Sequence, residues 1–353
     1  MKARIVIGAN YGDEGKGTVV ANYTKNSDNV LNILTNGGAQ RGHSILTKDG
    51  NITFQHFGAG TYHGADNYYS RYFILNPMQF VKEYETLIVK PKNIYRDINC
   101  KWSTPYDSMA NLISEEQKGT HASCCMGIWN TIKRYNEIPT LNYDDFIKNQ
   151  EFQIQYLLNI KKYYEKKLII PEKWKSIWNS DILIINFIND CFFMYNKTIV
   201  KKLSELTYNN LIFENGQGLL LSDNGKDTYD TTPSNTGILY SLELLKDLDI
   251  DDVTAHYVTR PYLTRHGDGV LMNQSIRKKI SSDVNEDRTN HYNDFQGEFR
   301  YGLLDINDLY KRINENANNI NYELEITHCD EMDRINDFKK VFNKINTYDT
   351  PLI

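Results

Sequence analysis

The chain has 353 residues, of which 40% are hydrophobic and 24% charged, and its formal net charge at pH 7 is -5. This length allows one large domain or two, and the acidic balance argues against a nucleic-acid-binding surface. We find no apolar run long enough to span a bilayer and no signal peptide before the first apolar segment. We therefore expect a cytoplasmic protein with neither nucleic acid nor a membrane as a partner.

The first apolar segment, residues 5–7, leads directly into a glycine-rich turn. This turn holds three glycines, two acids and one lysine: Gly12, Asp13, Glu14, Gly15, Lys16 and Gly17. Glycines let a backbone approach an anion closely, and the N–H groups of a following helix point at it, so the pattern predicts a strand that ends in a phosphate-binding loop. The loop resembles a P-loop, but Asn10 stands where the usual spacing has a glycine. A carboxylate such as Asp13 suits such a loop only if it binds Mg²⁺ or handles a proton.

Apolar segments with strand and helix patterns alternate along the chain. We expect strands at residues 5–7, 30–34, 52–57, 211–213, 253–259 and 324–327. We expect helices at residues 77–89, 145–166 and 182–206. The alternation predicts an α/β fold, a single domain over residues 1–353 with a central, largely parallel sheet flanked by helices. Residues 277–290 are polar and charged, which predicts a mobile loop that could act as a lid.

Three motifs in the same order resemble the signatures of the adenylosuccinate synthetase family. They are residues 12–17, residues 36–44 and residues 213–218, the last followed by 232–236. The family has Gly-His-Thr at the end of the second motif, and Glu-Gly-Ala-Gln-Gly followed by Thr-Ser-Ser-Asn-Thr in the third. The resemblance runs from Ile5 to about Asp330. It implies an enzyme in which the 6-oxygen of a purine nucleotide attacks a γ-phosphate and the amine of aspartate then displaces the 6-phosphoryl group.

The resemblance also implies a role for several residues of the first two motifs. Asp13 would be the base that removes the purine N1 proton and a Mg²⁺ ligand, with the carbonyl of Gly42 as a second ligand. His43 would be the acid, since its ordinary pKa lies near neutrality, and Lys16 would supply fixed positive charge beside the phosphates. The remaining residues expected to bind the triphosphate are Gly12, Glu14, Gly15, Gly17, Ser44 and Asp330.

The same resemblance implies contacts to the purine nucleotide and to aspartate. The residues expected at the purine nucleotide are Asp13, Gln40, Thr120, Ser123, Arg134, Gln217 and Thr232. Spacing does not decide between Thr120 and Ser123 as a phosphate contact. Arg134 falls where the family, as a homodimer, sends an arginine into the neighbouring subunit's site, although a solvated arginine fits equally well. Arg300 is the candidate for binding the carboxylates of L-aspartate, because a guanidinium binds a carboxylate in a bidentate manner.

Departures from the family pattern bear on the substrate. Arg300 alone remains of the family's arginine cluster, and Gly297 or Glu298 stands near the place of the arginine that reaches the ribose 2′-hydroxyl. Gln40 and Arg41 replace the family's Asn-Ala. The loss of the arginine favours dGMP over IMP and likeness to the short phage-type members, which make succino-2-amino-2′-deoxyadenylate. Such a protein would work in the host cytoplasm.

The phosphoryl donor and two other classes of function remain open at this point. His328 replaces the lysine of the family's Thr-Lys-x-Asp motif, so ATP becomes an alternative to GTP. A non-catalytic nucleotide-binding protein would keep the same loops. A P-loop NTPase that acts on water would hydrolyse triphosphate without aspartate or a purine monophosphate.

Overall fold

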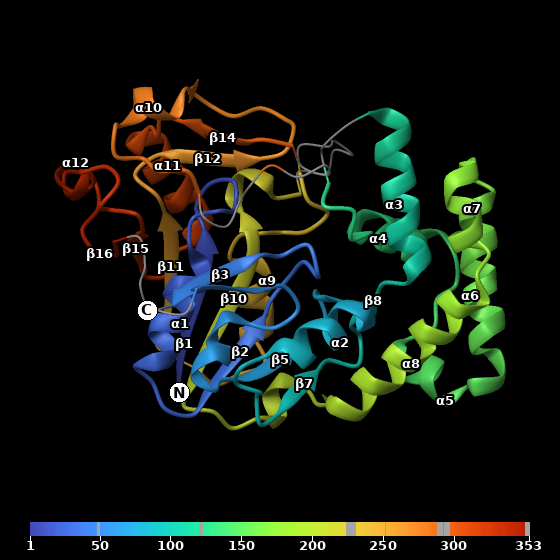
Figure 1. Cartoon of the computed structure of the whole chain (residues 1–353). Helices are drawn as coiled ribbons and strands as arrows, with labels where there is room; N and C mark the ends of the chain where they lie inside the picture. The colour runs from blue at the N-terminus through green and yellow to red at the C-terminus, as the bar shows by residue number, and fades with distance from the viewer. Residues whose placement is uncertain are drawn as a thin grey trace.

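The computed structural model describes residues 1–47, 50–119, 123–223, 231–250, 252–287, 292 and 297–349. A nine-stranded sheet lies at the centre, with the order β16-β15-β11-β1-β10-β2-β5-β7-β9 and every neighbouring pair parallel (Figure 1). Its strands are β1 (Lys2–Gly8), β2 (Val30–Leu34), β5 (Asp66–Tyr69), β7 (Ile94–Arg96), β9 (Ile199–Val200), β10 (Asn210–Gly218), β11 (Asp252–Thr259), β15 (Tyr322–Ile326) and β16 (Ile345–Thr347). The predicted α/β class with a parallel sheet is confirmed.

The sheet is covered on both faces, which explains its continuous apolar strands. In β1, Val6 packs into one buried cluster, while Ile5 and Ile7 pack into a second cluster on the other face. Helix α1 (Lys16–Lys25) contributes to the first cluster, and α9 (Leu239–Leu245) and α11 (Ile306–Ala317) contribute to the second. Parallel strands that are buried on both faces read as uninterrupted hydrophobic runs, as β2 does.

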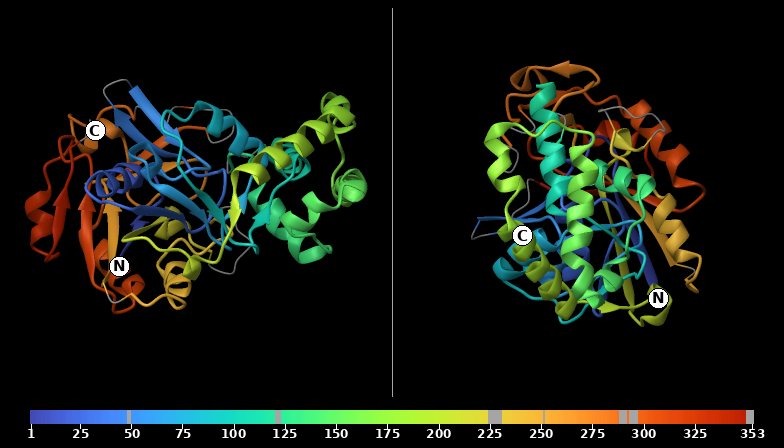
Figure 2. Two further views of the ribbon diagram at one scale, coloured as in Figure 1. Left: turned by 90° about the horizontal axis from the view of Figure 1, so that it is seen from below. Right: turned by 90° about the vertical axis from the view of Figure 1, so that its right-hand side faces the viewer.

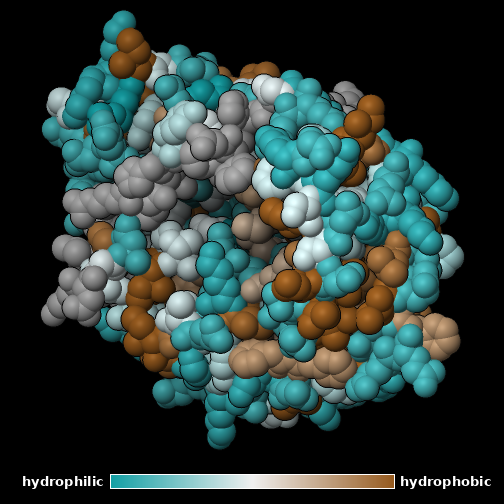
Figure 3. All heavy atoms as spheres, turned by 45° about the vertical axis from the view of Figure 1, so that its right-hand side comes forward, coloured by the Kyte–Doolittle hydropathy of each residue, from teal (hydrophilic) through white to brown (hydrophobic). Residues whose placement is uncertain are grey.

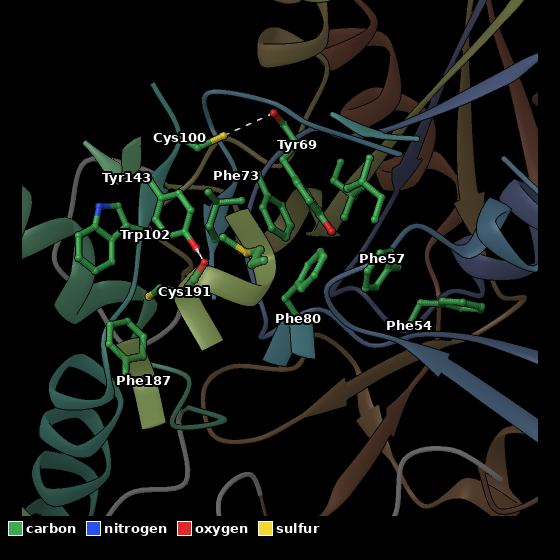
Figure 4. Close-up of a cluster of buried hydrophobic side chains, with 14 of the residues drawn as sticks. Phe54, Phe57, Tyr69, Phe73, Phe80, Cys100, Trp102, Tyr143, Phe187 and Cys191 are labelled. Atoms are coloured by element: carbon green, nitrogen blue, oxygen red, sulfur yellow. Dashed lines mark hydrogen bonds between the residues drawn. The ribbon is translucent and has the colours of Figure 1, made fainter. Parts of the chain in front are cut away.

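A group of helices extends beyond the β7–β9 edge of the sheet (Figures 1 and 2). These helices are α3 (Pro105–Lys118), α4 (Ile128–Glu137), α5 (Tyr143–Lys148), α6 (Gln150–Glu165), α7 (Glu172–Trp178) and α8 (Asp181–Lys197). We call them the helical module. Its side chains Tyr143 and Phe187 belong to the same buried cluster as Trp102 of β8 (Lys101–Trp102) and Phe80, and the Tyr143 hydroxyl donates 2.6 Å to the carbonyl of Cys191 (Figure 4). One continuous core therefore joins the module to the sheet.

Shorter elements surround the sheet. They are the β3 (His43–Thr47) and β4 (Gly50–Phe54) hairpin, the pair β6 (Ile74–Leu75) and β8 (Lys101–Trp102), the three-stranded β12 (Leu263–His266), β14 (Phe299–Gly302) and β13 (Gln274–Ser275), the helices α2 (Pro77–Thr86), α10 (Arg277–Ile280) and α12 (Ile335–Lys339), and the 3-10 turns η1 (Ala59–His63), η2 (Leu203–Glu205) and η3 (Leu219–Leu221). No helix in the described ranges is long and apolar enough to cross a membrane. On the face seen in Figure 3, hydrophobic side chains are interspersed with hydrophilic ones.

Four predicted elements differ from the structure. Residues 52–57 do not join the main sheet, because β4 pairs antiparallel with β3 outside it. The helix predicted at residues 145–166 is divided at Asn149 into α5 and α6, and the one predicted at 182–206 ends at Lys197. The segment from residue 277 begins with the short helix α10, and residues 288–290 of the predicted loop lie outside the described residues.

The order of strands creates a crevice at the carboxyl edge of the sheet. Strand β1 lies between β10 and β11, and the chain runs to β2 on one side of it and to β15 on the other. Ligands of open parallel sheets bind where the direction of winding reverses, just outside the carboxyl ends of the strands. The first two glycine-rich motifs follow β1 and β2, and the third forms the carboxyl end of β10, which brings all three to the same edge.

Candidate active site

The loop after β1 takes its shape from two glycines and one buried carboxylate. Gly12 and Gly15 have φ angles of 121° and 89°, which side chains disfavour. One oxygen of Glu14 accepts hydrogen bonds of 2.8 Å from the N–H groups of both Asn10 and Gly12. The other lies 3.2 Å from Nζ of Lys16, which also donates 2.5 Å to the carbonyl of Gly12. The carboxylate of Glu14 thus points into the loop and shapes it, and binding of the triphosphate by Glu14 remains a prediction.

Helix α1 follows this loop with its N-terminus open. Its cap residue, Gly15, provides no side-chain hydrogen bond to the first turn. The helix also packs closely on β3, because a Cβ at Gly17 would lie 2.6 Å from the carbonyl oxygen of Ser44. A free helix N-terminus with a lysine in its first turn attracts anions. The local structure therefore has the features of a phosphate site.

Two clefts open at this edge and share a wall. The first cleft is lined by Asp13, His43 and seven of the eight residues predicted to bind the triphosphate: Gly12, Gly15, Lys16, Gly17, Gly42, Ser44 and Asp330. The second cleft is lined by five residues predicted at the purine nucleotide: Asp13, Gln40, Ser123, Gln217 and Thr232. Gly12, Asp13, Gly42 and His43 line both clefts. These four residues therefore form a wall that the two clefts share.

Asp13 is a carboxyl group whose surroundings favour its neutral form. Burial raises its pKa to about 6, and the negative charge of Asp287 adds to this effect. A cation beside Asp13 would relieve this penalty. The carboxylate of Asp13 and the carbonyl of Gly42 are both oxygen donors on the shared wall, and oxygen donors suit Mg²⁺, which retains other positions for water and phosphate oxygens. These two residues therefore fit the metal that the sequence implies.

His43 lies against a buried ion pair that the sequence did not reveal. Nδ1 of His43 contacts a carboxylate oxygen of Glu214, and Nη2 of Arg41 lies 3.1 Å from the same oxygen. Burial lowers the pKa of His43 to about 4, with the charge of Arg41 as the next cause. Burial alone would raise the pKa of Glu214, but the charges of Arg41 and His43 outweigh it and hold that pKa at about 2. Glu214 is therefore a carboxylate, and a resting His43 is neutral.

The second cleft presents side-chain amides to a ligand. Gln217 follows the end of the apolar part of β10 in a left-handed conformation with φ of 57°. Its Oε1, and both amide atoms of Gln40, are buried without a hydrogen-bond partner among the described residues. Buried amides of this kind are costly unless a ligand or water satisfies them. Thr120, the alternative to Ser123 as a phosphate contact, lies outside the described residues.

Arg134 corrects a prediction, because it lines neither cleft and does not reach solvent. Its side chain is fully buried in α4, where Nε donates 2.9 Å and Nη2 donates 3.0 Å to the two carboxylate oxygens of Asp107. Asp107 also caps α3 by accepting from the N–H of Thr104, and it accepts from the hydroxyl of Tyr164. The guanidinium thus joins α3, α4 and α6 within its own chain, and it is not available to a nucleotide or to a neighbouring subunit.

Arg300 lies close to the second cleft without lining it. Its Nη2 donates to the carbonyls of Gly267 and Gly269, at 2.6 Å and 2.8 Å, and its Nη1 donates 3.1 Å to Gln274. The loop that it holds contributes His266 and Asp268 to the cleft wall. Binding of aspartate by Arg300 remains a prediction, and it requires the guanidinium to leave these carbonyls.

Arg260 is a further residue of the first cleft that the sequence analysis missed. It follows β11 directly and lines the cleft together with Asp287 and His328. The sequence could have indicated Arg260, because residue 260 follows a predicted strand at 253–259. The carboxyl ends of parallel strands meet at one edge of the sheet, where the site lies. Lys16 and Arg260 thus place two cationic side chains in this cleft.

Comparisons with known proteins agree with the geometry. The profile of the family described as Adenylosuccinate synthetase matches residues 5–343. Adenylosuccinate synthetase of Syntrophotalea carbinolica is 24% identical over 80% of this chain and 68% of its own length, and that of Thermodesulfovibrio yellowstonii is 26% identical over 96% and 80%.

Two solved structures share the fold. The fully ligated adenylosuccinate synthetase of Plasmodium falciparum has a TM-score of 0.68 and 19% identity, covering 95% of this chain and 78% of its own. The succinoaminodeoxyadenylate synthetase of cyanophage S-2L, bound to dGMP and to dATP as an energy donor, has a TM-score of 0.66 and 11% identity, covering 99% and 91%. With the family profile matched along almost the whole chain and its motifs gathered around two adjoining clefts, this protein belongs to the adenylosuccinate synthetase family of carbon–nitrogen ligases.

Proposed function

We propose that this chain joins L-aspartate to C6 of a 6-oxopurine nucleoside monophosphate, and that dGMP is its preferred substrate. The observation that carries the proposed reaction is the wall shared by the two clefts at Asp13 and His43. A triphosphate on the N-terminal loop and a purine in the second cleft would bring the γ-phosphate and the 6-oxygen together at this wall. Holding two reactants in this way converts a bimolecular step into an effectively unimolecular one.

The side chains on the shared wall suit the first step. Asp13 would take the N1 proton while the purine 6-oxygen attacks the γ-phosphorus, and the bond between that phosphorus and the β–γ bridging oxygen breaks to release a nucleoside diphosphate. His43 would donate a hydrogen bond to the transferred group, and Lys16 would balance charge on the phosphates. Mg²⁺ held by Asp13 and Gly42 would neutralise further phosphate charge. Because a resting His43 is neutral, the bound phosphates must supply the negative charge that favours its protonation.

In the second step the free amine of aspartate attacks C6 and the C6–O bond breaks. Inorganic phosphate leaves with the 6-oxygen and takes up the proton that the amine loses. Arg300 is the proposed ligand for the aspartate carboxylates, since its guanidinium lies beside the loop that contributes His266 to the second cleft. The amine must be held over C6 to react. For this step the protein therefore has to bind aspartate next to the second cleft.

The preference for dGMP is supported by one position near the second cleft. The carbonyl of Gly297 lies 3.3 Å from Nε2 of His266, which lines that cleft. The family pattern has an arginine for the ribose 2′-hydroxyl near this position, and neither Gly297 nor Glu298 brings a cation there. A nucleotide without a 2′-hydroxyl loses nothing by this change. The dGMP bound by the cyanophage protein supports the same choice.

IMP is the second candidate substrate. It is favoured by the curated relatives, which are adenylosuccinate synthetases with 24–26% identity to this chain. Both purines carry the same N1–H group and 6-oxygen, so contacts with these groups do not separate them. The donor likewise stays open between ATP and GTP, because His328 rather than a lysine lines the first cleft.

A phosphate-release assay separates these possibilities. IMP, GMP and dGMP are compared at equal concentration, each with L-aspartate, Mg²⁺ and either ATP or GTP. We expect the highest kcat/KM with dGMP, and GMP below it. If IMP reacts at least as efficiently as dGMP, the dGMP preference is wrong and the chain makes adenylosuccinate.

The same assay tests the reaction class. Phosphate release without aspartate or a monophosphate would indicate a hydrolase, and tight nucleotide binding without release would indicate a binding protein. Asp13→Asn and His43→Asn should each lower kcat by ~10²–10⁴-fold while calorimetric nucleotide binding changes little. His63→Asn, at the end of η1 and outside both clefts, is the matched control and should keep wild-type activity.

A further inference from the structure

Arg41 lies beside His43, and both residues line the second cleft. Nη2 of Arg41 is 3.0 Å from Nδ1 of His43 and 3.1 Å from Oε1 of Glu214. Nδ1 of His43 contacts the same oxygen of Glu214. The three side chains are at most 5% exposed, so water competes little for these contacts.

The arrangement decides which way the imidazole faces. A carboxylate only accepts hydrogen bonds, so Nδ1 of His43 carries a hydrogen and donates it to Glu214, and Nη2 of Arg41 donates to Glu214 as well. The second oxygen of Glu214 accepts 3.1 Å from the N–H of Ala59, which fixes the carboxylate in the core. With Nδ1 turned toward Glu214, Nε2 on the opposite side of the ring is left for the two clefts that His43 lines.

Space for Arg41 depends on a glycine in another motif. A Cβ at Gly216 would lie 3.1 Å from Cγ and 3.3 Å from Cδ of Arg41, which is closer than ordinary van der Waals contact. In the family pattern, the places of Arg41 and Gly216 are both taken by alanine. The two departures from that pattern are therefore in contact, although 175 positions separate them in the sequence.

We propose that Arg41 is a positioning residue, which holds Glu214 so that His43 keeps Nε2 directed at the transferred phosphoryl group, and that Gly216 is the compensating change that admits it. The proposal rests on the role of His43 in the proposed function. An outer hydrogen-bond partner of this kind typically contributes 10–100-fold to the activity of the group that it orients.

Kinetics test the effect on catalysis. Arg41→Met keeps an unbranched apolar side chain and removes the guanidinium, and we expect kcat to fall by ~10–100-fold with each KM within about threefold of wild type. Arg41→Lys restores a cation and should recover most of the loss. Arg71→Met removes an arginine outside both clefts and serves as the control. Wild-type kcat in Arg41→Met, or a change in KM alone, would overturn the proposal.

A spectroscopic measurement tests the same contact without any reaction. The ¹⁵N resonances of histidine report which ring nitrogen carries the hydrogen, and the His43→Asn protein assigns the signal. In the ligand-free protein we expect His43 with its hydrogen on Nδ1, and loss of this single state in Arg41→Met. This result stands even if no purine nucleotide reacts, so it separates failure of the proposal from failure of the proposed function. An unchanged signal in Arg41→Met would refute the positioning role.

A double-mutant cycle tests the link between the two motifs. Gly216→Ala adds one methyl group against Arg41 and changes no charge, so it should lower kcat on its own. In the presence of Arg41→Ala, the same methyl group no longer meets Cγ and Cδ of Arg41 and has the carbonyl oxygen of Asn36 at 3.4 Å, an ordinary contact, so it should cost little. Residues in contact give non-additive effects, whereas additive effects would show that Gly216 does not serve Arg41. Gly216→Ala and Arg41→Lys also keep the proposal testable if removal of the charge prevents folding.

Discussion

The backbone carbonyl of Asp13 accepts a hydrogen bond of 2.7 Å from Nε of Arg260, and Nη2 of the same guanidinium donates 2.5 Å to Asp287. Asp13 belongs to the loop after β1, whereas Asp287 follows α10 on another wall of the first cleft. One buried cation therefore connects two walls of the proposed triphosphate site. It also places positive charge next to the group that is proposed to act as the base.

Replacement of Arg260 should weaken triphosphate binding in particular. Arg260→Met removes the donor to Asp13 and a cation of the first cleft, and a hydrogen bond to a charged group is typically worth ~1.5–3 kcal/mol. We expect the KM for the triphosphate to rise by ~10–100-fold and the KM for the purine nucleotide to change much less. Arg260→Lys should be intermediate. Steady-state kinetics with each substrate varied in turn measure these KM values. A KM for the purine nucleotide that rose more than the KM for the triphosphate would contradict the assignment of Arg260 to the triphosphate site.

The base of the proposed reaction should destabilise the ligand-free protein at neutral pH. The pKa of Asp13 is about 6 in the folded protein, against an ordinary 3.8, so the folded state holds the proton more tightly. The contribution of Asp13 to the free energy of unfolding is therefore most favourable below pH 4. It falls by ~1–3 kcal/mol as the pH rises through 6. Asp13→Asn removes this loss.

Urea unfolding at two pH values measures the effect. Without ligands, Asp13→Asn should be more stable than the wild type at pH 7.5, and the difference should shrink at pH 4.5. Asp287→Asn should lower the pKa of Asp13, because its charge contributes to the shift. Equal stability of the wild type and Asp13→Asn at both pH values would mean that burial does not raise the pKa of this carboxyl.

Arg134 should matter for stability and not for nucleotide affinity. Arg134→Leu leaves Asp107 buried without its cation, and breaking a buried pair from one side typically costs ~3–5 kcal/mol. We expect a lower free energy of unfolding in urea, with an unchanged KM for the purine nucleotide in the protein that stays folded. A raised KM at wild-type stability would restore the role in nucleotide binding that the sequence suggested.

Arg300 should act on aspartate. If its guanidinium leaves the carbonyls of Gly267 and Gly269 to bind the aspartate carboxylates, Arg300→Leu raises the KM for aspartate by ~10–100-fold and that for the purine nucleotide far less. Asp305→Asn, a cap substitution at the start of α11 away from both clefts, controls for disturbance near β14. A larger effect on the purine KM would assign Arg300 to the nucleotide.

Much of the first cleft could be predicted from the sequence because its signal is local. Glycines at positions 12 and 15 after an apolar run require a loop with left-handed backbone, and the structure has both φ angles positive. The second motif also follows a strand and the third forms the carboxyl end of one, and parallel strands deliver their loops to the same edge of the sheet. Neither inference needs knowledge of distant contacts.

The contacts of several charged residues could not be predicted from the sequence. The carboxylate of Glu14 is bound by two N–H groups of its own loop. Arg134 reads as exposed or as a contact to another subunit, and its partner Asp107 lies 27 positions earlier on another helix. Arg41 gave no signal of its function, because Glu214 is distant in the chain. The local pattern also could not show that residues 50–54 pair with β3 instead of joining the main sheet.

The second cleft lies between the two parts of the molecule. Asn111 and Trp129 come from α3 and α4 of the helical module, while Gln217 and Thr232 come from the chain around the end of β10. A nucleotide that contacts both sides stabilises the packing of the helical module against the sheet relative to the ligand-free protein. Substrate affinity and resistance to unfolding are then linked quantities, so changes deep inside the module will alter the apparent affinity for a purine that they never touch.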